Sequence, residues 1–123
     1  MFASHTLIDL GTDSLERVDY PDFAHKVAHA ILDGTADIGI LICGTGIGMS
    51  ISANRFKDIR AAVCHDETSA KLARFHNNAN ILCMGGRLIG ILTAIDITRA
   101  FLKTPFEGER HLTRLQKIED TTN

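Results

Sequence analysis

The chain has 123 residues and a mass of 13.5 kDa, so we expect one domain over residues 1–123, which excludes a multidomain enzyme. Hydrophobic residues make up 45% of the chain and charged residues 23%, with a mean hydropathy of +0.05, which excludes a disordered or fibrous protein. With 13 Lys and Arg against 15 Asp and Glu, there is no excess positive charge to hold nucleic acid or an anionic membrane. We therefore expect a small-molecule ligand, held by a few placed groups.

Apolar runs and cysteines narrow the class further. The longest apolar runs, such as residues 38–43, fall short of the ~20 residues that a membrane span needs. No charged-then-apolar leader opens the sequence, so we expect a soluble, cytoplasmic protein. Cys43, Cys64 and Cys83 are odd in number and widely spaced, which argues against a disulfide framework and against a Cys-x-x-Cys metal site. We expect free thiols.

The first third of the chain predicts a strand and a helix. A short strand-like run, residues 7–10, ends at a glycine. A proline then stands where a helix can begin, and apolar side chains recur after it at four-residue spacing: Phe23, Val27 and Ile31. We therefore expect an amphipathic helix over residues 21–33.

The remainder of the chain alternates strands with helices. Residues 38–43 are continuously apolar, which is typical of a strand buried on both faces of a parallel sheet. After a glycine turn we expect a short helix over residues 49–54, a strand over 59–64, a helix over 67–76 capped by Asp66, a strand over 80–84, a helix over 92–102 and a charged helix over 110–120. This alternation predicts right-handed crossovers and a doubly wound parallel sheet, a Rossmann-like three-layer α/β/α fold.

The glycine turn after the first buried strand is the most informative segment, with the sequence Cys-Gly-Thr-Gly-Ile-Gly over residues 43–48. Ligands bind beyond the carboxyl ends of the strands in open parallel sheets, and glycines let the backbone approach a ligand closely. The start of the following helix adds unpaired N–H groups and partial positive charge, which would act on the Cys43 sulfur. Cys64 and Cys83 lie in later strands without such a turn, so we expect them to be inert core residues.

Two nucleotide-binding patterns can be compared with this turn. The Walker pattern is absent because no Lys-Ser/Thr pair follows the glycines, so a nucleoside triphosphate is not expected. The dinucleotide pattern fits better, because Gly44 and Gly46 have its spacing and Asp66 stands ~20 residues further on, where a ribose-binding acid belongs. Met49, however, occupies the position of the third small residue. A dinucleotide-binding module is therefore the alternative to an enzyme.

Two further groups of polar residues are candidates for binding. His76 and Asn77 stand at the end of a predicted helix, just before the next strand. Arg110 and Arg114 are four residues apart, so they share a helix face and could grip one phosphate by charge-assisted hydrogen bonds. Arg87 is a third candidate cation. Taken alone, such residues are more typical of a solvated surface.

Motifs spread along the chain carry a family resemblance. Besides the cysteine block and His76-Asn77, they are Asp19-Tyr20-Pro21, Ala53-Asn54, Ile59-Arg60-Ala61, Gly85 with Arg87, and Phe106-Glu107-Gly108-x-Arg110-His111. Together they closely resemble ribose-5-phosphate isomerase B, from about residue 7 to the last helix. The resemblance implies interconversion of ribose 5-phosphate and ribulose 5-phosphate through an enediolate, in the pentose phosphate pathway and without metal or cofactor. It also implies allose 6-phosphate as a secondary substrate, and a homodimer or dimer of dimers with active sites at the subunit interface.

The same resemblance implies a role for each site residue. Cys43 matches the general base that moves a proton between C2 and C1 of the sugar, with Thr45 as a further catalytic residue, and His76 matches the acid/base that opens the furanose ring. The substrate-binding residues are Tyr20 near the ring oxygens, Gly44, Gly46, Ile47 and Gly48 with their amides around the enediolate, Asn77 at the same end, and Arg87, Arg110 and Arg114 on the phosphate. The two tail arginines are expected to reach the partner's site.

The sequence departs from the family at its start. Family members begin with a strand, an Asp-His turn and a helix ahead of the segment that residues 7–11 match, and His5 does not replace the missing histidine. We therefore expect a form that is N-terminally truncated relative to the family, as a truncated or mis-started gene product, with an unpaired sheet edge and uncovered apolar surface. The alternative is an inactive truncated partner subunit.

Overall fold

The structure, a computed structural model, describes residues 4–12 and 14–121 and is built on a parallel sheet. The sheet has three strands in the order β1-β3-β2, with β1 at Gly39–Cys43, β2 at Ala61–Val63 and β3 at Ile81–Gly85. Both outer strands pair with β3, and the register places Cys43 opposite Gly85 at the carboxyl ends. Each connection between successive strands passes through a helix, as the sequence predicts.

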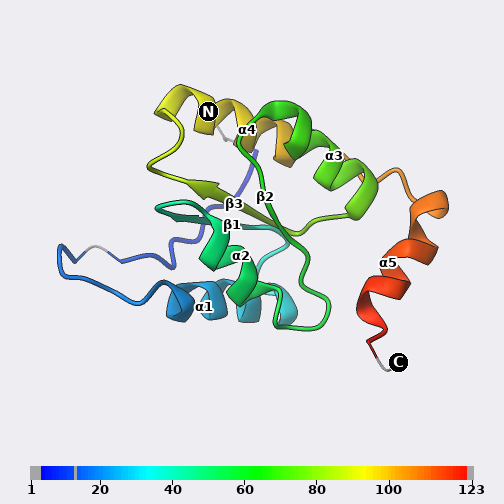
Figure 1. The fold of residues 1–123 in the computed structure, drawn as a ribbon, viewed down its shortest axis with the longest axis horizontal. Coiled ribbons are helices and arrows are strands. Elements are labelled where there is room, and N and C mark those ends of the chain that lie inside the picture. The colour runs from blue at the N-terminus through cyan, green and yellow to red at the C-terminus, as the bar shows by residue number, and fades with distance from the viewer. Residues whose placement is uncertain (1–3, 13, 122–123) are drawn as a thin grey trace.

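Helices cover both faces of the sheet (Figure 1). On one face lie α1 (Tyr20–Leu32) and α2 (Ile47–Ala53), and on the other lie α3 (Glu67–Asn77) and α4 (Ile91–Lys103). A 3₁₀ turn, Glu109–His111, and α5 (Leu112–Glu119) follow beside the end of α3. The predicted doubly wound, three-layer α/β fold is confirmed.

The central strand supplies both hydrophobic cores. Because successive side chains of a strand point to opposite faces, Leu82 lies in the core with Phe101 of α4, while Ile81 lies in the core with Ala28 of α1. All five residues of β3 are buried, as expected for a strand with a neighbour on each side. The sheet is therefore a rigid base for the loops at its two ends.

Most predicted elements are confirmed within three residues. The Asp66 cap of α3 is also confirmed, since its side chain accepts a hydrogen bond from Ser69 N–H at 2.7 Å. The helix α2 begins two residues earlier than predicted because Gly46, with a φ of 80°, closes the turn and lets the helix begin at Ile47. None of the helices in the described part of the chain is long and apolar enough to cross a bilayer.

The strand predicted over residues 7–10 is wrong. Leu7 is 88% exposed and Ile8 is 47% exposed, and the three described strands pair only with one another. A strand exists only where its N–H and C=O groups find a neighbouring strand. Residues 7–10 are largely apolar but have no neighbouring strand among the described residues, so they do not form a strand.

The prediction that β1 is buried on both faces is also wrong. Gly39 and Leu41 are buried, whereas Ile40 and Ile42 are 36% and 56% exposed. These two isoleucines alternate with Leu41, so they point toward the α3 and α4 side, where the core takes residues from β3 and β2 but none from β1. One face of β1 is therefore open in the described part of the chain, as is its outer edge.

The core on the α4 side can be tested with two substitutions in the same helix. Phe101 is fully buried, so Phe101→Ala should lower the free energy of unfolding by ~3–5 kcal/mol through lost contacts and a cavity. Leu92, 79% exposed, is the matched control, and Leu92→Ala should change that free energy by less than ~0.5 kcal/mol. Urea unfolding measures both, and equal losses would contradict this packing.

Candidate functional site

Cys43 is the last residue of β1 and begins the loop that leads to α2. It lies at the carboxyl edge of the sheet, which is the edge formed by the C-terminal ends of the parallel strands. The cysteine is half-buried, and Gly46 N–H donates a hydrogen bond to Cys43 Sγ at 3.1 Å. Gly46 can do so because it adopts a left-handed conformation, with a φ of 80°, that favours glycine. The turn therefore folds back and places a backbone donor on the sulfur.

Close backbone contacts hold this loop against β3. A Cβ on Gly46 would lie 2.9 Å from the carbonyl carbon of Met84, and a Cβ on Gly85 would lie 2.8 Å from the backbone oxygen of Thr45. Both distances are shorter than real Cβ contacts, so the loop and the strand can approach this closely only with glycine at both positions. Packing against the sheet thus explains these two glycines.

Some donors of the loop already have acceptors. Gly46 N–H faces the Cys43 sulfur, and Ile47 N–H donates to Thr45 Oγ1 at 3.3 Å. The next N–H groups of the first turn of α2, beginning at Gly48, have no acceptor within the helix. These first-turn N–H groups are therefore the members of the predicted amide cradle that have no acceptor in the helix and can donate to a ligand.

Tyr20 and Arg87 lie against the same loop. A Cβ on Gly48 would lie 2.5 Å from Tyr20 Cε1, so the tyrosine ring packs directly on that glycine. Arg87 runs over Gly44, whose Cβ would lie 3.5 Å from Arg87 Cδ, and Arg87 N–H donates to Gly44 O at 3.1 Å. The structure therefore brings together these predicted site residues at one edge: Tyr20, Cys43, Gly44, Thr45, Gly46, Ile47, Gly48 and Arg87.

The remaining predicted residues form a second group. His76 and Asn77 end α3, Arg110 lies in the 3₁₀ turn, and Arg114 lies in α5. Together with His111 they line an open pocket of about 560 Å³. The structure thus confirms that the tail arginines share one surface, and it places the His-Asn pair on that surface too.

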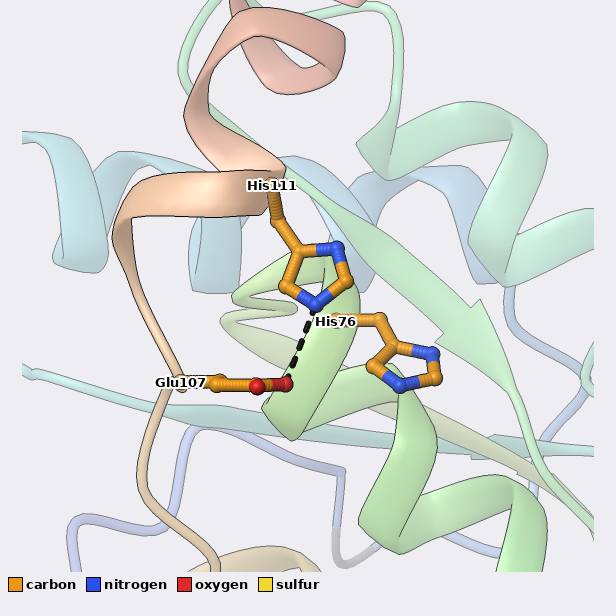
Figure 2. Close-up of side chains that lie close together, drawn as sticks. All are labelled: His76, Glu107 and His111. Carbon is orange, nitrogen blue, oxygen red and sulfur yellow. Dashed lines mark hydrogen bonds and ion pairs between the residues drawn. The ribbon is translucent and has the colours of Figure 1, made fainter.

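Two residues that the sequence analysis did not select, Glu107 and His111, organise this pocket (Figure 2). Glu107 Oε2 lies 3.1 Å from His111 Nε2 and 3.1 Å from Arg110 Nη2. The His111 ring is 7% exposed, and its centroid lies 4.7 Å from that of His76. Burial raises the pKa of the Glu107 carboxyl, but bonding and charge from His111 and Arg110 outweigh it and hold the pKa below its ordinary value.

The same group is the one among the described residues that could hold a metal ion. One ligand atom each from His76, Glu107 and His111 lies within 4.8 Å of the others. Arg110 already places its cationic guanidinium against Glu107 Oε2 and His111 Nε2. The positive charge that a metal ion would bring to these two atoms is therefore present in the chain itself.

The two groups lie at opposite edges of the sheet (Figure 1). Cys43 is at the carboxyl end of β1, whereas α3 runs back along the sheet and ends just before β3 begins. A five-residue strand separates the two edges by ~13 Å. Cys43 and His76 of one chain are therefore too far apart to act in the same site.

The other predicted polar positions have structural roles. Burial, with the neighbouring Cys43 and Cys64 thiols adding to it, raises the pKa of Cys83 to about 12, and burial also raises the pKa of Cys64. Both are buried free thiols, as predicted. Asp66 is occupied as the cap of α3, so the dinucleotide alternative loses the acid that would bind the ribose.

Comparison with known proteins identifies the family. Residues 2–118 match the family model described as Ribose/Galactose Isomerase. The chain belongs to the ribose/galactose isomerase family. It is 55% identical to a putative sugar phosphate isomerase of Bacillus subtilis, over 92% of this chain and 76% of that protein. It is 50% identical to ribose-5-phosphate isomerase B of Escherichia coli, over 91% of this chain and 75% of that protein.

Solved structures of the family share the fold. A ribose-5-phosphate isomerase B of Clostridium thermocellum aligns with a TM-score of 0.93 and 50% identity, over 95% of this chain and 79% of that one. The enzyme of Mycoplasma genitalium, solved with bound ribulose-5-phosphate, aligns with a TM-score of 0.90 and 43% identity, over 94% of this chain and 78% of that one. The predicted family and the Rossmann-like fold are both confirmed.

The three thiols should differ sharply in reactivity. Cys43 is half-buried and sits at a loop, whereas Cys64 and Cys83 are 2% and 0% exposed and have raised pKa values. We expect a neutral-pH titration with an aromatic disulfide reagent to modify Cys43 quickly in the native chain, and all three cysteines only in denaturant. Cys43→Ser should remove the fast phase and Cys83→Ser should keep it. A fast phase that survives in Cys43→Ser would contradict the assignment.

Proposed function

We propose that the chain interconverts ribose 5-phosphate and ribulose 5-phosphate through an enediolate, without metal or cofactor. The observation that carries the proposal is the half-buried Cys43 sulfur beside the first turn of α2, with Gly46 N–H bonded to it. A base next to backbone donors is what removal of a proton beside a carbonyl requires. The relative with bound ribulose-5-phosphate supports the substrate class.

The proton transfer uses the open-chain aldose. The Cys43 thiolate takes the proton from C2, the C–H electron pair becomes the C1–C2 double bond, and negative charge moves to O1. The proton of the O2 hydroxyl moves to O1, which becomes the C1 hydroxyl group. The O2 electron pair then forms the ketone carbonyl at C2, and the double-bond electrons take the thiol proton at C1, which regenerates the thiolate. First-turn N–H groups of α2 stabilise the charged oxygens. Thr45 Oγ1 accepts from Ile47 N–H, so its own O–H can donate to a sugar oxygen.

The second group of residues handles the other parts of the sugar. His76 exchanges the proton that opens the furanose ring, and the exposed Asn77 beside it binds sugar hydroxyls. Arg110 and Arg114 hold the phosphate, because guanidinium groups bind phosphate oxygens by paired, charge-assisted hydrogen bonds. Arg87, at the cysteine edge, approaches the phosphate from the other side, and Tyr20 contacts the ring oxygens.

A complete site needs two copies of the chain. Cys43 and His76 lie at opposite edges of the sheet, so one reaction centre combines the cysteine edge of one copy with the histidine edge of its partner. In a two-fold homodimer the same contact forms twice, which gives two identical sites. On this proposal His76 and Asn77 reach the partner's site together with the tail arginines.

Removal of the base is the direct test of the chemistry. Cys43→Ala should lower the conversion of ribose 5-phosphate by ~10²–10⁴-fold, which is the contribution of a positioned general base. Cys64→Ala is the matched control, because Cys64 is buried away from the loop and its loss should leave the turnover of the folded chain nearly unchanged. A colorimetric ketose assay on both purified variants measures this, and wild-type turnover in Cys43→Ala would refute the proposal.

The shared site predicts complementation between two inactive variants. A mixture of Cys43→Ala and His76→Ala chains, after dissociation and reassociation, forms mixed dimers in which one of the two sites is intact. Random mixing should restore about one quarter of the wild-type activity. If each site belonged to one chain, the mixture would stay as inactive as its components.

Three assays separate the alternatives. Tight binding in a titration with NAD would favour the dinucleotide-binding module. A folded, pure chain without any turnover would favour the inactive partner subunit. Turnover of allose 6-phosphate, measured beside ribose 5-phosphate, would establish the secondary substrate.

A further inference from the structure

One carboxylate connects the parts of the histidine-edge pocket. Glu107 Oε2 accepts a hydrogen bond from Arg110 Nη2 at 3.1 Å. The same oxygen lies 3.1 Å from His111 Nε2, and Figure 2 shows this contact. Arg110 Nε also lies 3.2 Å from His111 Nε2. That nitrogen donates to Glu107 Oε2 when it carries a hydrogen and accepts from Arg110 Nε when it does not, so Glu107 and Arg110 share one contact on the ring. Arg110 is 68% exposed and Glu107 is 29% exposed. A long, exposed arginine has many conformations, so these contacts are what fix its guanidinium beside the pocket.

The carboxylate also reaches His76 through His111. The His76 and His111 rings lie 4.7 Å apart with their planes tilted by 35°. Because His111 is 7% exposed and bonded to Glu107, its ring is a fixed surface against which the His76 ring packs. The orientation of His76 thus depends on a contact that Glu107 makes with its neighbour.

The backbone of Glu107 is anchored at the same place. Glu107 N–H donates a hydrogen bond to Phe75 O at 3.0 Å, one residue before His76 in α3. The segment that leads to Arg110 is therefore tied to the end of α3 by its main chain, and to His111 and Arg110 by its side chain. Such doubly held groups lose little freedom when they bind a ligand.

We propose that Glu107 is a positioning residue of the active site, which holds Arg110 for the substrate phosphate and, through His111, holds the ring of His76. The proposal rests on the proposed function for the roles of Arg110 and His76 and for the identity of the sugar. Glu107 itself does not line the pocket, whose lining residues are His76, Asn77, Arg110, His111 and Arg114. The negative charge of Glu107 would repel phosphate, whereas its contact with Arg110 would orient the guanidinium that binds phosphate. These two effects have opposite signs, so a phosphate-binding measurement on a Glu107 variant shows which one dominates.

The experiment compares two carboxylates of the same segment. Glu107→Gln removes the charge and weakens the paired contacts, whereas Glu109→Gln removes the same charge from an exposed residue of the adjacent 3₁₀ turn. The readouts are binding of inorganic phosphate by calorimetry, and KM and kcat for ribose 5-phosphate. Glu107→Gln should weaken phosphate binding and raise KM by about tenfold. Glu109→Gln should change both by less than about twofold.

A double-mutant cycle with Arg110→Ala shows whether Glu107 acts through the arginine. In the Arg110→Ala background, Glu107→Gln should weaken phosphate binding by less than about twofold, because the group it positions is gone. An unchanged tenfold loss in that background, or equal effects of Glu107→Gln and Glu109→Gln, would overturn the proposal. Absence of phosphate binding by the wild-type chain would overturn it as well. Phosphate binding with the predicted cycle but no isomerase turnover would refute only the proposed function.

Discussion

The direction of the chain in a parallel sheet is the constraint on which the site depends. Every strand must be followed by a helix that returns to the starting edge, so a residue that follows a strand and a residue that ends the next helix lie at opposite edges. Cys43 follows β1, and His76 ends α3, which fixes them on opposite sides of the sheet. No side-chain rotation spans a five-residue strand of ~13 Å. The fold itself therefore divides the predicted site residues between two surfaces, and this separation is the reason for the proposal that a complete centre combines two chains.

The cysteine edge is held by the backbone, whereas the histidine edge is held by side chains. At the cysteine edge, the absence of Cβ atoms at Gly46 and Gly85 lets the loop lie directly on β3, and the sulfur receives a backbone donor. At the histidine edge, Glu107 bonds to two neighbours on a short turn. Backbone contacts of the first kind suit a proton transfer, which needs atoms fixed within a fraction of an ångström. Side-chain networks suit phosphate, which several exposed cations can hold.

Most helices and strands could be predicted from the sequence because each is encoded by an apolar run or a helix-capping residue within a few positions of it. The strand at β3 and the Asp66 cap of α3 depend on residues within a few positions of each other, and both were found. Residues 7–10 and the outer face of β1 were mispredicted, because a strand and a buried face depend on neighbours that composition does not supply. The cysteine loop was recognised from the closely spaced glycines at positions 44, 46 and 48. Glu107 was quoted within a family motif but was given no role, since its partners Phe75 and Arg110 meet it only after α3 and the tail have packed together.

The net negative charge of the chain does not favour an anionic substrate, but two arginines lie together at one pocket. The chain carries a formal charge of −2, so a sugar phosphate gains nothing from the overall field and must be attracted by a short-range cluster. Arg110 and Arg114 line the pocket with two histidines, and the adjacent carboxylate of Glu107 contacts Arg110 and His111. Its charge is therefore balanced by the Arg110 guanidinium, and Arg114 lines the same pocket. An anion that reaches this edge meets a net positive surface, although the molecule as a whole is acidic. On the proposed function, the fold thereby separates attraction of the phosphate from the proton transfer at the thiol, and a contact between two copies would bring the two together.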